Sequence, residues 1–213
     1  MRPLLWLLVT GGFAALNFWT VSRGEDRGQD TVYSYEVLAS AVIAYGILAL
    51  VVYALTTGLD RREVLALRAP ASWSRALGLA VAGAVAAVLG AAALLALTNA
   101  GDEQNLAPED WDGSRAGAYA ASFLAIVVIG PLVEELLYRG AGVGLFLPFG
   151  TPAAIGVTAI VFGFGHGLLL SLPALVWFGV VTGWLRVHTR SVYPAVVAHA
   201  LFNAFGMIAP LVV

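Results

Sequence analysis

The chain has 213 residues, of which 60% are hydrophobic and 11% are charged, and its mean hydropathy is +0.87. Soluble domains carry about a quarter charged residues, so this composition excludes a soluble protein and indicates an integral membrane protein. The net charge of −2 gives no support for nucleic-acid binding, and the lack of cysteine excludes disulfides, a catalytic thiol and thiolate metal sites.

Seven apolar segments are long enough to cross a bilayer, and they predict an all-α, polytopic transmembrane helical bundle of seven to eight spans. They lie at about 3–21, 36–57, 75–98, 116–138, 152–168, 171–187 and 192–212. The first segment is similar to the apolar part of a signal peptide, but it lacks a small-x-small cleavage site, which favours a retained helix. The glycine-rich stretch 140–150 is too short to span, so it either extends the fourth helix or forms a re-entrant segment.

Arginines are divided unequally between the two sides of the predicted bundle. If the spans alternate, eight lie on the side of the N-terminus: Arg2, Arg61, Arg62, Arg68, Arg75, Arg139, Arg186 and Arg190. Three lie on the other side, together with the acidic loop 101–113: Arg23, Arg27 and Arg115. Cytoplasmic loops are enriched in basic residues, so the bias predicts a cytoplasmic N-terminus in the inner membrane of the cell.

Most of the charges lie in predicted loops. The ionisable or strongly polar residues that stand out from this pattern are Glu134, Glu135, Arg139, His166, His199 and Asn203. Burying a charge in hydrocarbon costs several kcal/mol, so such residues usually serve a function. Glu135 and Arg139 are four residues apart on one helix face and can pair, whereas Glu134 points about 100° away and stays free for another partner.

The other polar residues of this group repeat the four-residue spacing. His199 and Asn203 can face one point, and so can Phe162 and His166. Each feature alone has an ordinary interpretation: an interfacial salt bridge for Glu135 and Arg139, helix-to-helix hydrogen bonds for His166 and Asn203, and packing for Phe162. Their coincidence in one small membrane protein favours a shared site.

Two further features of the C-terminal half have structural interpretations. His188, in the sequence "RVHTR" at a helix end, is interpreted as solvated or interfacial. Gly179 and Gly183 repeat at helical spacing, which in lipid predicts close packing of two helices.

A glutamate with two histidines can activate water for amide hydrolysis, the glutamate acting as general base. A histidine and an asparagine can donate hydrogen bonds to the oxyanion that forms. The same residues could instead hold zinc, through Glu134, His166 and His199. Other intramembrane protease chemistries are excluded, because the chain has no HExxH motif, no aspartate in a span and no Gly-x-Ser in a span.

Three motifs carry a resemblance to a known family. "EELLYRG" (134–140), "FGFGH" (162–166) and "HALFN" (199–203) resemble the EExxxR, FxxxH and HxxxN motifs of the CPBP intramembrane proteases, which include the type II CAAX prenyl endopeptidases. The order matches across three helices, and the resemblance covers the C-terminal half. The length suits one integral membrane domain over 1–213, and the resemblance implies a catalytic core at about 116–213 behind N-terminal helices at about 3–98.

The resemblance also implies a role for each matched residue. Glu134 would be the general base, with His166 as its partner in holding the water. His199 and Asn203 would form the oxyanion site. The supporting residues would be Glu135, Arg139 and Phe162. The resemblance favours a glutamate-type mechanism without a cofactor, with zinc as the alternative.

The implied partners are the lipid bilayer and a peptide or membrane-protein substrate, and the sequence sets no oligomeric state. The small size and short loops indicate a bacterial member, related to proteins that process bacteriocin precursors. A non-catalytic scaffold or bacteriocin-immunity protein of the same fold is the alternative function. A proton-coupled transporter is disfavoured, because the chain has no internal repeat.

One aspect of the predicted topology does not suit a shared site. Strictly antiparallel spans put Glu134 near the cytoplasmic end of its helix and His166 near the opposite end of the next. A shared site therefore requires tilted or short helices, or a re-entrant 140–150. Pro131 and the glycines between 140 and 144 permit such irregularity.

Overall fold

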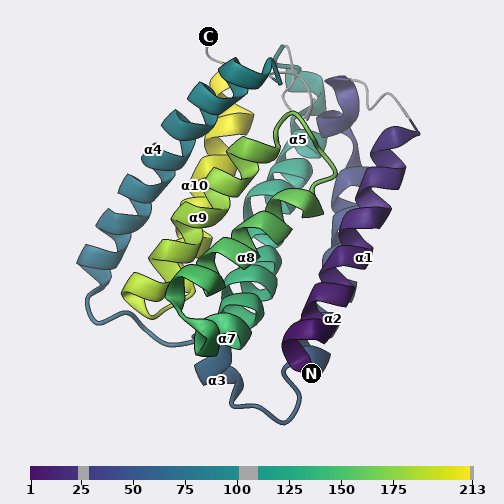
Figure 1. The fold of residues 1–213 in the computed structure, drawn as a ribbon. Coiled ribbons are helices and arrows are strands. Elements are labelled where there is room, and N and C mark those ends of the chain that lie inside the picture. Colours follow the sequence, from purple (N-terminus) through teal and green to yellow (C-terminus); the bar gives the residue numbers. More distant parts are fainter. Residues whose placement is uncertain (24–28, 101–109, 212–213) are drawn as a thin grey trace.

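The computed structural model describes residues 1–23, 29–100 and 110–211, and within these ranges the chain is helical without a β-strand (Figure 1). The elements outside the central rod are α1 (Arg2–Ser22), η1 (Gln29–Tyr33), α2 (Tyr35–Leu55), α3 (Arg61–Val64), α4 (Trp73–Thr98), α8 (Thr151–Gly165), α9 (Leu172–Thr189), α10 (Tyr193–Ile208) and η6 (Ala209–Leu211). The all-α prediction is confirmed. Figure 1 shows the N-terminus, α3 and α7 at one end of the bundle, and the C-terminus at the other.

The central rod runs without interruption from Gly113 to Phe149. Its parts are η2 (Gly113–Arg115), α5 (Ala116–Phe123), η3 (Leu124–Ile129), α6 (Gly130–Glu135), η4 (Leu136–Gly142), α7 (Val143–Phe146) and η5 (Leu147–Phe149). The stretch 140–150 therefore extends the fourth helix and is not a re-entrant segment. The predicted end of this helix at 138 was wrong by about three turns.

Two segments of this rod, η3 and η4, are wider π-helical turns. Pro131 accounts for the first of them, because proline has no N–H to donate and its ring displaces the carbonyl four residues earlier. Gly140 lies inside the second, against the side chain of Leu65. Turns of this kind inside α-helices are frequent at functional sites. These two flank α6, which carries Glu134 and Glu135.

Local sequence sets the starts of the other helices. Ser34, Asp60 and Ser72 cap the N-termini of α2, α3 and α4, each accepting a hydrogen bond from a backbone N–H of the first turn. A proline stands in the first turn of α1, α8, α9 and α10, where its missing N–H costs no hydrogen bond.

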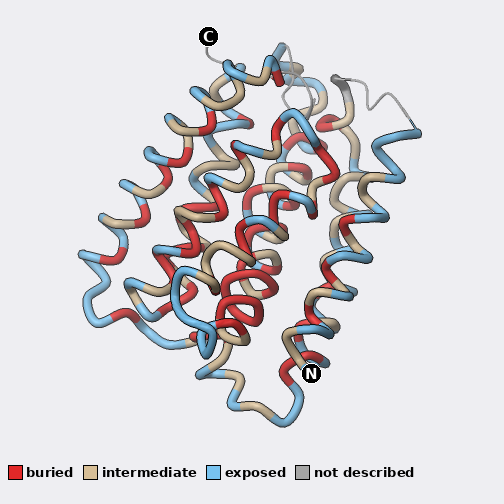
Figure 2. Tube along the Cα trace, in the orientation of Figure 1, coloured by how far each residue is buried: buried red, intermediate tan, exposed pale blue. Residues whose placement is uncertain are grey.

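Five helical segments of the described chain are long and apolar enough to cross a membrane: Arg2–Ser22, Tyr35–Leu55, Trp73–Thr98, Gly113–Phe149 and Tyr193–Leu211. The helix α8 is apolar but shorter, and α9 carries Arg186 and His188 in its last turn. A membrane protein is thus supported, and the count of seven to eight spans stays a prediction. Large apolar side chains such as Leu8, Ile43 and Leu89 are exposed, where lipid would cover them. Figure 2 shows many exposed residues along the outer helices α1 and α4.

The core lies between the central rod and the helices around it (Figure 2). Trp6 of α1 is fully buried and donates a hydrogen bond of 3.0 Å from its indole N–H to the carbonyl of Leu137. The Trp6 ring also meets the rings of Tyr138 and Phe146 edge-on, at 6.0 and 5.7 Å. A hydrogen bond to a backbone carbonyl therefore joins the first helix to the π-helical turn η4.

Close packing of α8 against α9 depends on small residues, as the spacing of Gly179 and Gly183 predicts. A Cβ atom at Gly179 would lie 2.8 Å from the Cα of Ala159, and one at Gly183 would lie 3.2 Å from Ile155. The Ala159 atom belongs to the backbone, so it cannot relieve the clash by a rotamer change as a side chain could.

We expect Gly179→Val to lower the free energy of unfolding by about 1–3 kcal/mol, because the added methyl groups must push α8 away from α9. Thermal unfolding in detergent would measure it. The control is Gly206→Val, since Gly206 is exposed and has open space around it. Equal melting temperatures for the two variants would show that α8 and α9 are less tightly packed than described.

Candidate active site

The turn at Gly150 brings two of the predicted site residues to the same height in the bundle. Glu134 lies 16 residues before Gly150 on the central rod, and His166 lies 16 residues after it, at the end of α8. At 1.5 Å per residue both are about 24 Å from the turn. Counting spans from the sequence separated them, because it ended the fourth helix at 138.

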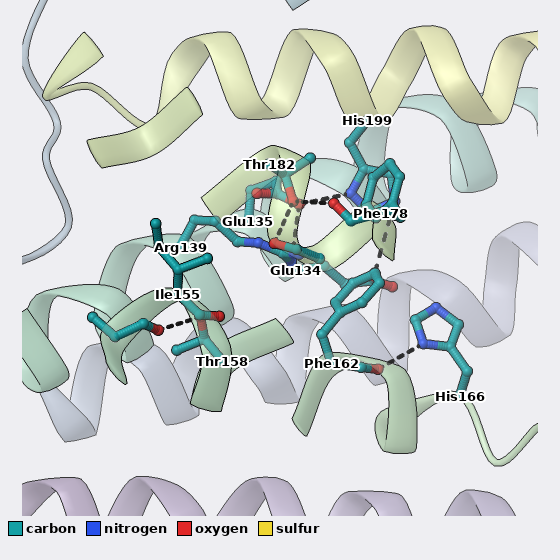
Figure 3. Close-up of polar contacts among 12 residues, drawn as sticks. Glu134, Glu135, Arg139, Ile155, Thr158, Phe162, His166, Phe178, Thr182 and His199 are labelled. Atoms are coloured by element: carbon teal, nitrogen blue, oxygen red, sulfur yellow. Dashed lines mark hydrogen bonds and ion pairs between the residues drawn. The ribbon is translucent and has the colours of Figure 1, made fainter. Parts of the chain in front are cut away.

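Glu135 and Arg139 form the predicted pair inside the bundle (Figure 3). Both side chains are 0% exposed, and Nη1 of Arg139 lies 3.2 Å from Oε1 of Glu135. The pair therefore lies among the helices of the bundle and not on its surface. Arg139 is therefore a buried residue of the central rod and not a loop charge, and the cytoplasmic N-terminus stays a prediction.

The buried guanidinium of Arg139 has few polar partners. Within the described residues, none of its nitrogens makes a hydrogen bond. The guanidinium forms an ion pair with Glu135. Its charge lies 4.3 Å above the centre of the Phe162 ring, a cation–π contact. Phe162 is buried and stacks on Phe178 at 5.5 Å. Packing was predicted for Phe162, and its position under the guanidinium was not.

His199 of α10 approaches both glutamates (Figure 3). Its Nδ1 lies 2.9 Å from Oε1 of Glu135, and its Nε2 lies 3.9 Å from Oε2 of Glu134. The carboxylate of Glu135, paired with Arg139, can only accept, so Nδ1 carries a proton. In the neutral ring Nε2 is then an acceptor that faces Glu134.

Glu134 differs from its neighbour in being partly open, with a side chain 17% exposed. Its Oε1 accepts a hydrogen bond of 2.7 Å from the hydroxyl of Tyr45 on α2, and its Oε2 faces His199. Sequence reasoning missed Tyr45. A signal existed, because a tyrosine in the middle of an apolar span needs a partner for its hydroxyl.

His166 lies beside Phe162 at the end of α8. It is half-buried, its Nδ1 lies 2.9 Å from the carbonyl oxygen of Phe162, and the two ring centres are 4.6 Å apart. The ring of His199 meets the same phenylalanine at 6.0 Å. The structure thus gathers both predicted histidines around one phenylalanine.

Asn203 occupies a different part of the site. Its side-chain amide donates a hydrogen bond of 2.8 Å to the carbonyl oxygen of Ile126, in the π-helical turn η3 before Glu134. This hydrogen bond stabilises the π-helical turn. The oxyanion role of Asn203 stays a prediction.

With this geometry known, the chain can be compared with other proteins. Residues 116–205 match the Rce1-like family of type II CAAX prenyl endopeptidases. The matched Rce1-like segment begins with α5, ends inside α10, and contains all three motifs noted in the sequence. The match suggests a protease of the CAAX type, and the long apolar helices suggest a membrane protein. Comparisons with curated proteins and with solved structures gave no match.

The Rce1-like segment contains the residues that could hold zinc, namely Glu134, His166 and His199. Both histidines engage Nδ1 with an oxygen atom, which leaves Nε2 for a ligand, as in many zinc sites. However, in the described ranges no three His, Asp or Glu side chains are close enough together to hold a metal ion. The donor types suit zinc and their arrangement does not, so we derive no step through a metal.

Proposed function

We propose that this protein is an intramembrane endopeptidase, which hydrolyses a peptide bond in a membrane-associated peptide or protein with water activated by Glu134. The main support is the contrast between two adjacent carboxylates in the Rce1-like segment. Glu135 is buried and neutralised by Arg139, whereas Glu134 is partly open and faces His199. Neighbouring carboxylates in opposed environments are typical of sites in which each has a different role.

In the proposed reaction, Glu134 takes a proton from water as the water oxygen attacks the peptide carbonyl carbon. His166 helps to hold the water. The carbonyl oxygen becomes an oxyanion, the C–N bond breaks, and the proton passes from Glu134 to the leaving amine. The 3.9 Å between Glu134 and Nε2 of His199 exceeds hydrogen-bond length and suits two groups bridged by a water.

The proposed oxyanion site uses His199 and the second amide N–H of Asn203, the first being bonded to the carbonyl oxygen of Ile126. The Nδ1 proton of His199 is committed to Glu135, so a hydrogen bond from Nε2 to the oxyanion requires a second proton on the ring. The buried carboxylate of Glu135 would stabilise that imidazolium. Glu135 and Arg139 are therefore proposed to act on catalysis through His199 and to have no contact with substrate.

Cleavage of peptides by the purified protein in detergent tests the proposal. The probes are a library of internally quenched peptides, some ending in a farnesylated cysteine of a CAAX sequence and others unmodified. Wild type is compared with Glu134→Gln, with and without a zinc chelator, and Glu36→Gln serves as the control because Glu36 is exposed at the start of α2.

Activity lost in Glu134→Gln and kept with the chelator would support a glutamate-activated water. Loss with both would favour a zinc site formed by Glu134, His166 and His199. Full activity of Glu134→Gln would overturn the proposed function. If the wild type cleaves no probe and Glu134→Ala keeps the cellular phenotype, the protein acts as a scaffold or immunity protein.

We expect His199→Asn to lower kcat by about 10²–10³-fold with a melting temperature close to wild type. The amide nitrogen of asparagine lies near the position of Nδ1, so it still donates to Glu135, but no atom replaces Nε2. In His199→Gln the amide lies near Nε2 and Glu135 loses its partner, so that variant should melt at a lower temperature.

The control is His188→Asn, because His188 is exposed and stacks on Trp184. Peptide cleavage and thermal unfolding are measured for all three variants. Wild-type kcat in His199→Asn would exclude a part for Nε2 in the reaction.

A further inference from the structure

The helices α1 and α2 precede the Rce1-like segment, and each makes a polar contact with it at the site. We propose that Tyr45 of α2 and Asn17 of α1 are positioning residues, Tyr45 fixing the carboxylate of Glu134 and Asn17 fixing the turn that carries His166. This inference rests on the proposed function of Glu134 and His166. It assigns a part in the reaction to two helices outside the matched segment.

Tyr45 determines which oxygen of Glu134 is available. The glutamate side chain has three rotatable bonds, and the 2.7 Å hydrogen bond from the Tyr45 hydroxyl fixes Oε1. With Oε1 held, Oε2 is the atom directed toward His199, where the reaction needs a base. A general base must be held within hydrogen-bond reach of the proton that it removes, and small displacements are costly.

The sequence of the central rod leaves room for this contact at Gly130. A Cβ atom there would lie 2.9 Å from the hydroxyl oxygen of Tyr45 and 3.1 Å from the ring carbon that bears it. Any larger residue would push the tyrosine away from Glu134, which is one helical turn further along the rod. The hydrogen bond between Tyr45 and Glu134 therefore depends on glycine at position 130.

Asn17 acts on the other side of the site. Its side-chain amide donates a hydrogen bond of 2.5 Å to the carbonyl oxygen of Gly165, the residue before His166. The last carbonyls of a helix have no partner within the helix, and Asn17 satisfies one of them at the end of α8. On the far side of His166, Gly167 has a φ of +71°, and a Cβ atom there would lie 2.8 Å from the carbonyl carbon of Asn17. His166 thus lies between Gly165, which accepts a hydrogen bond from the Asn17 side chain, and Gly167, whose lack of a Cβ leaves room for the backbone of Asn17.

The first experiment measures kcat and KM of Tyr45→Phe and Asn17→Ala with a quenched peptide that the wild type cleaves. We expect kcat to fall about 10- to 100-fold in each variant with little change in KM, because the reacting groups are displaced while the substrate still binds. The matched controls are Tyr53→Phe, an exposed tyrosine of the same helix, and Thr20→Ala, whose hydroxyl bonds within α1. Variants that match their controls in kcat would overturn the proposal, since a bond that only joins helices changes stability and not turnover per folded molecule.

The second experiment needs no substrate and separates this inference from the proposed function. Tyr45→Phe is expected to lower the melting temperature in the wild-type background and to leave it unchanged in a Glu134→Ala background, because the hydrogen bond is already absent there. Equal shifts in both backgrounds would overturn the Tyr45–Glu134 contact. If Glu134→Gln is inactive and Tyr45→Phe turns over normally, the positioning role alone fails. If Glu134→Gln is fully active, the proposed function fails, and with it any part of Tyr45 in catalysis.

Discussion

We expect Glu134→Gln to lower kcat by about 10²–10⁴-fold while the protein stays folded, because the variant loses the general base and little else. The amide has the size of the carboxylate, and its oxygen can still accept the hydrogen bond from Tyr45. The amide nitrogen then takes the place of Oε2, 3.9 Å from Nε2 of His199. It cannot take a proton from water.

Peptide cleavage and thermal unfolding of the purified variant check both parts of this expectation. The matched comparison is Glu135→Gln, one residue along the same helix, where the change weakens a buried ion pair. Glu135→Gln should lose stability as well as turnover, because the Glu135 carboxylate also supports His199, whereas Glu134→Gln should lose turnover alone. The reverse pattern would show that the two carboxylates have been assigned to the wrong roles.

Arg139→Met is expected to lower the free energy of unfolding by about 3–5 kcal/mol, the usual cost of leaving one member of a buried ion pair alone. Glu135 is 0% exposed, and within the described residues the charged or titratable partner left to it would be His199. The variant also loses the cation that lies over Phe162. Denaturant unfolding in mixed micelles measures the loss.

Two further variants test the cause. In Glu135→Met/Arg139→Met no charge is left unpaired, so the double variant should be more stable than Arg139→Met alone. Arg62→Met removes an exposed arginine and should have almost no effect. A double variant less stable than the single one would mean that packing around the arginine, and not its charge, holds this region together.

The sequence located the N-terminal helices well, because long apolar runs with polar flanks define them. The predicted spans 36–57 and 75–98 compare with Tyr35–Leu55 and Trp73–Thr98 in the structure. The central rod was predicted too short, at 116–138. Charged residues and then glycines lower the hydropathy of the rod after residue 133. Burial against other helices stabilises the rod there, and a single sequence does not show which helices are in contact.

Part of the candidate site followed from spacing within one helix. The pairing of Glu135 with Arg139 is such a case, since four residues separate them. The bond between Glu135 and His199 and the approach of Tyr45 to Glu134 were not predicted. They join residues 64 and 89 positions apart, and no periodic pattern links such residues.

The equal distances from Gly150 to Glu134 and to His166 have a consequence for how this protein could change in evolution. An inserted residue on either side of the turn would shift one of the two groups by about 1.5 Å along the bundle and rotate it by about 100°. Loss or gain of length on one helix would then have to be matched on the other. Glu134 and His166 are 32 positions apart in the sequence. In related chains that share the site, we expect the length of this separation to vary less than the identities of the residues within it.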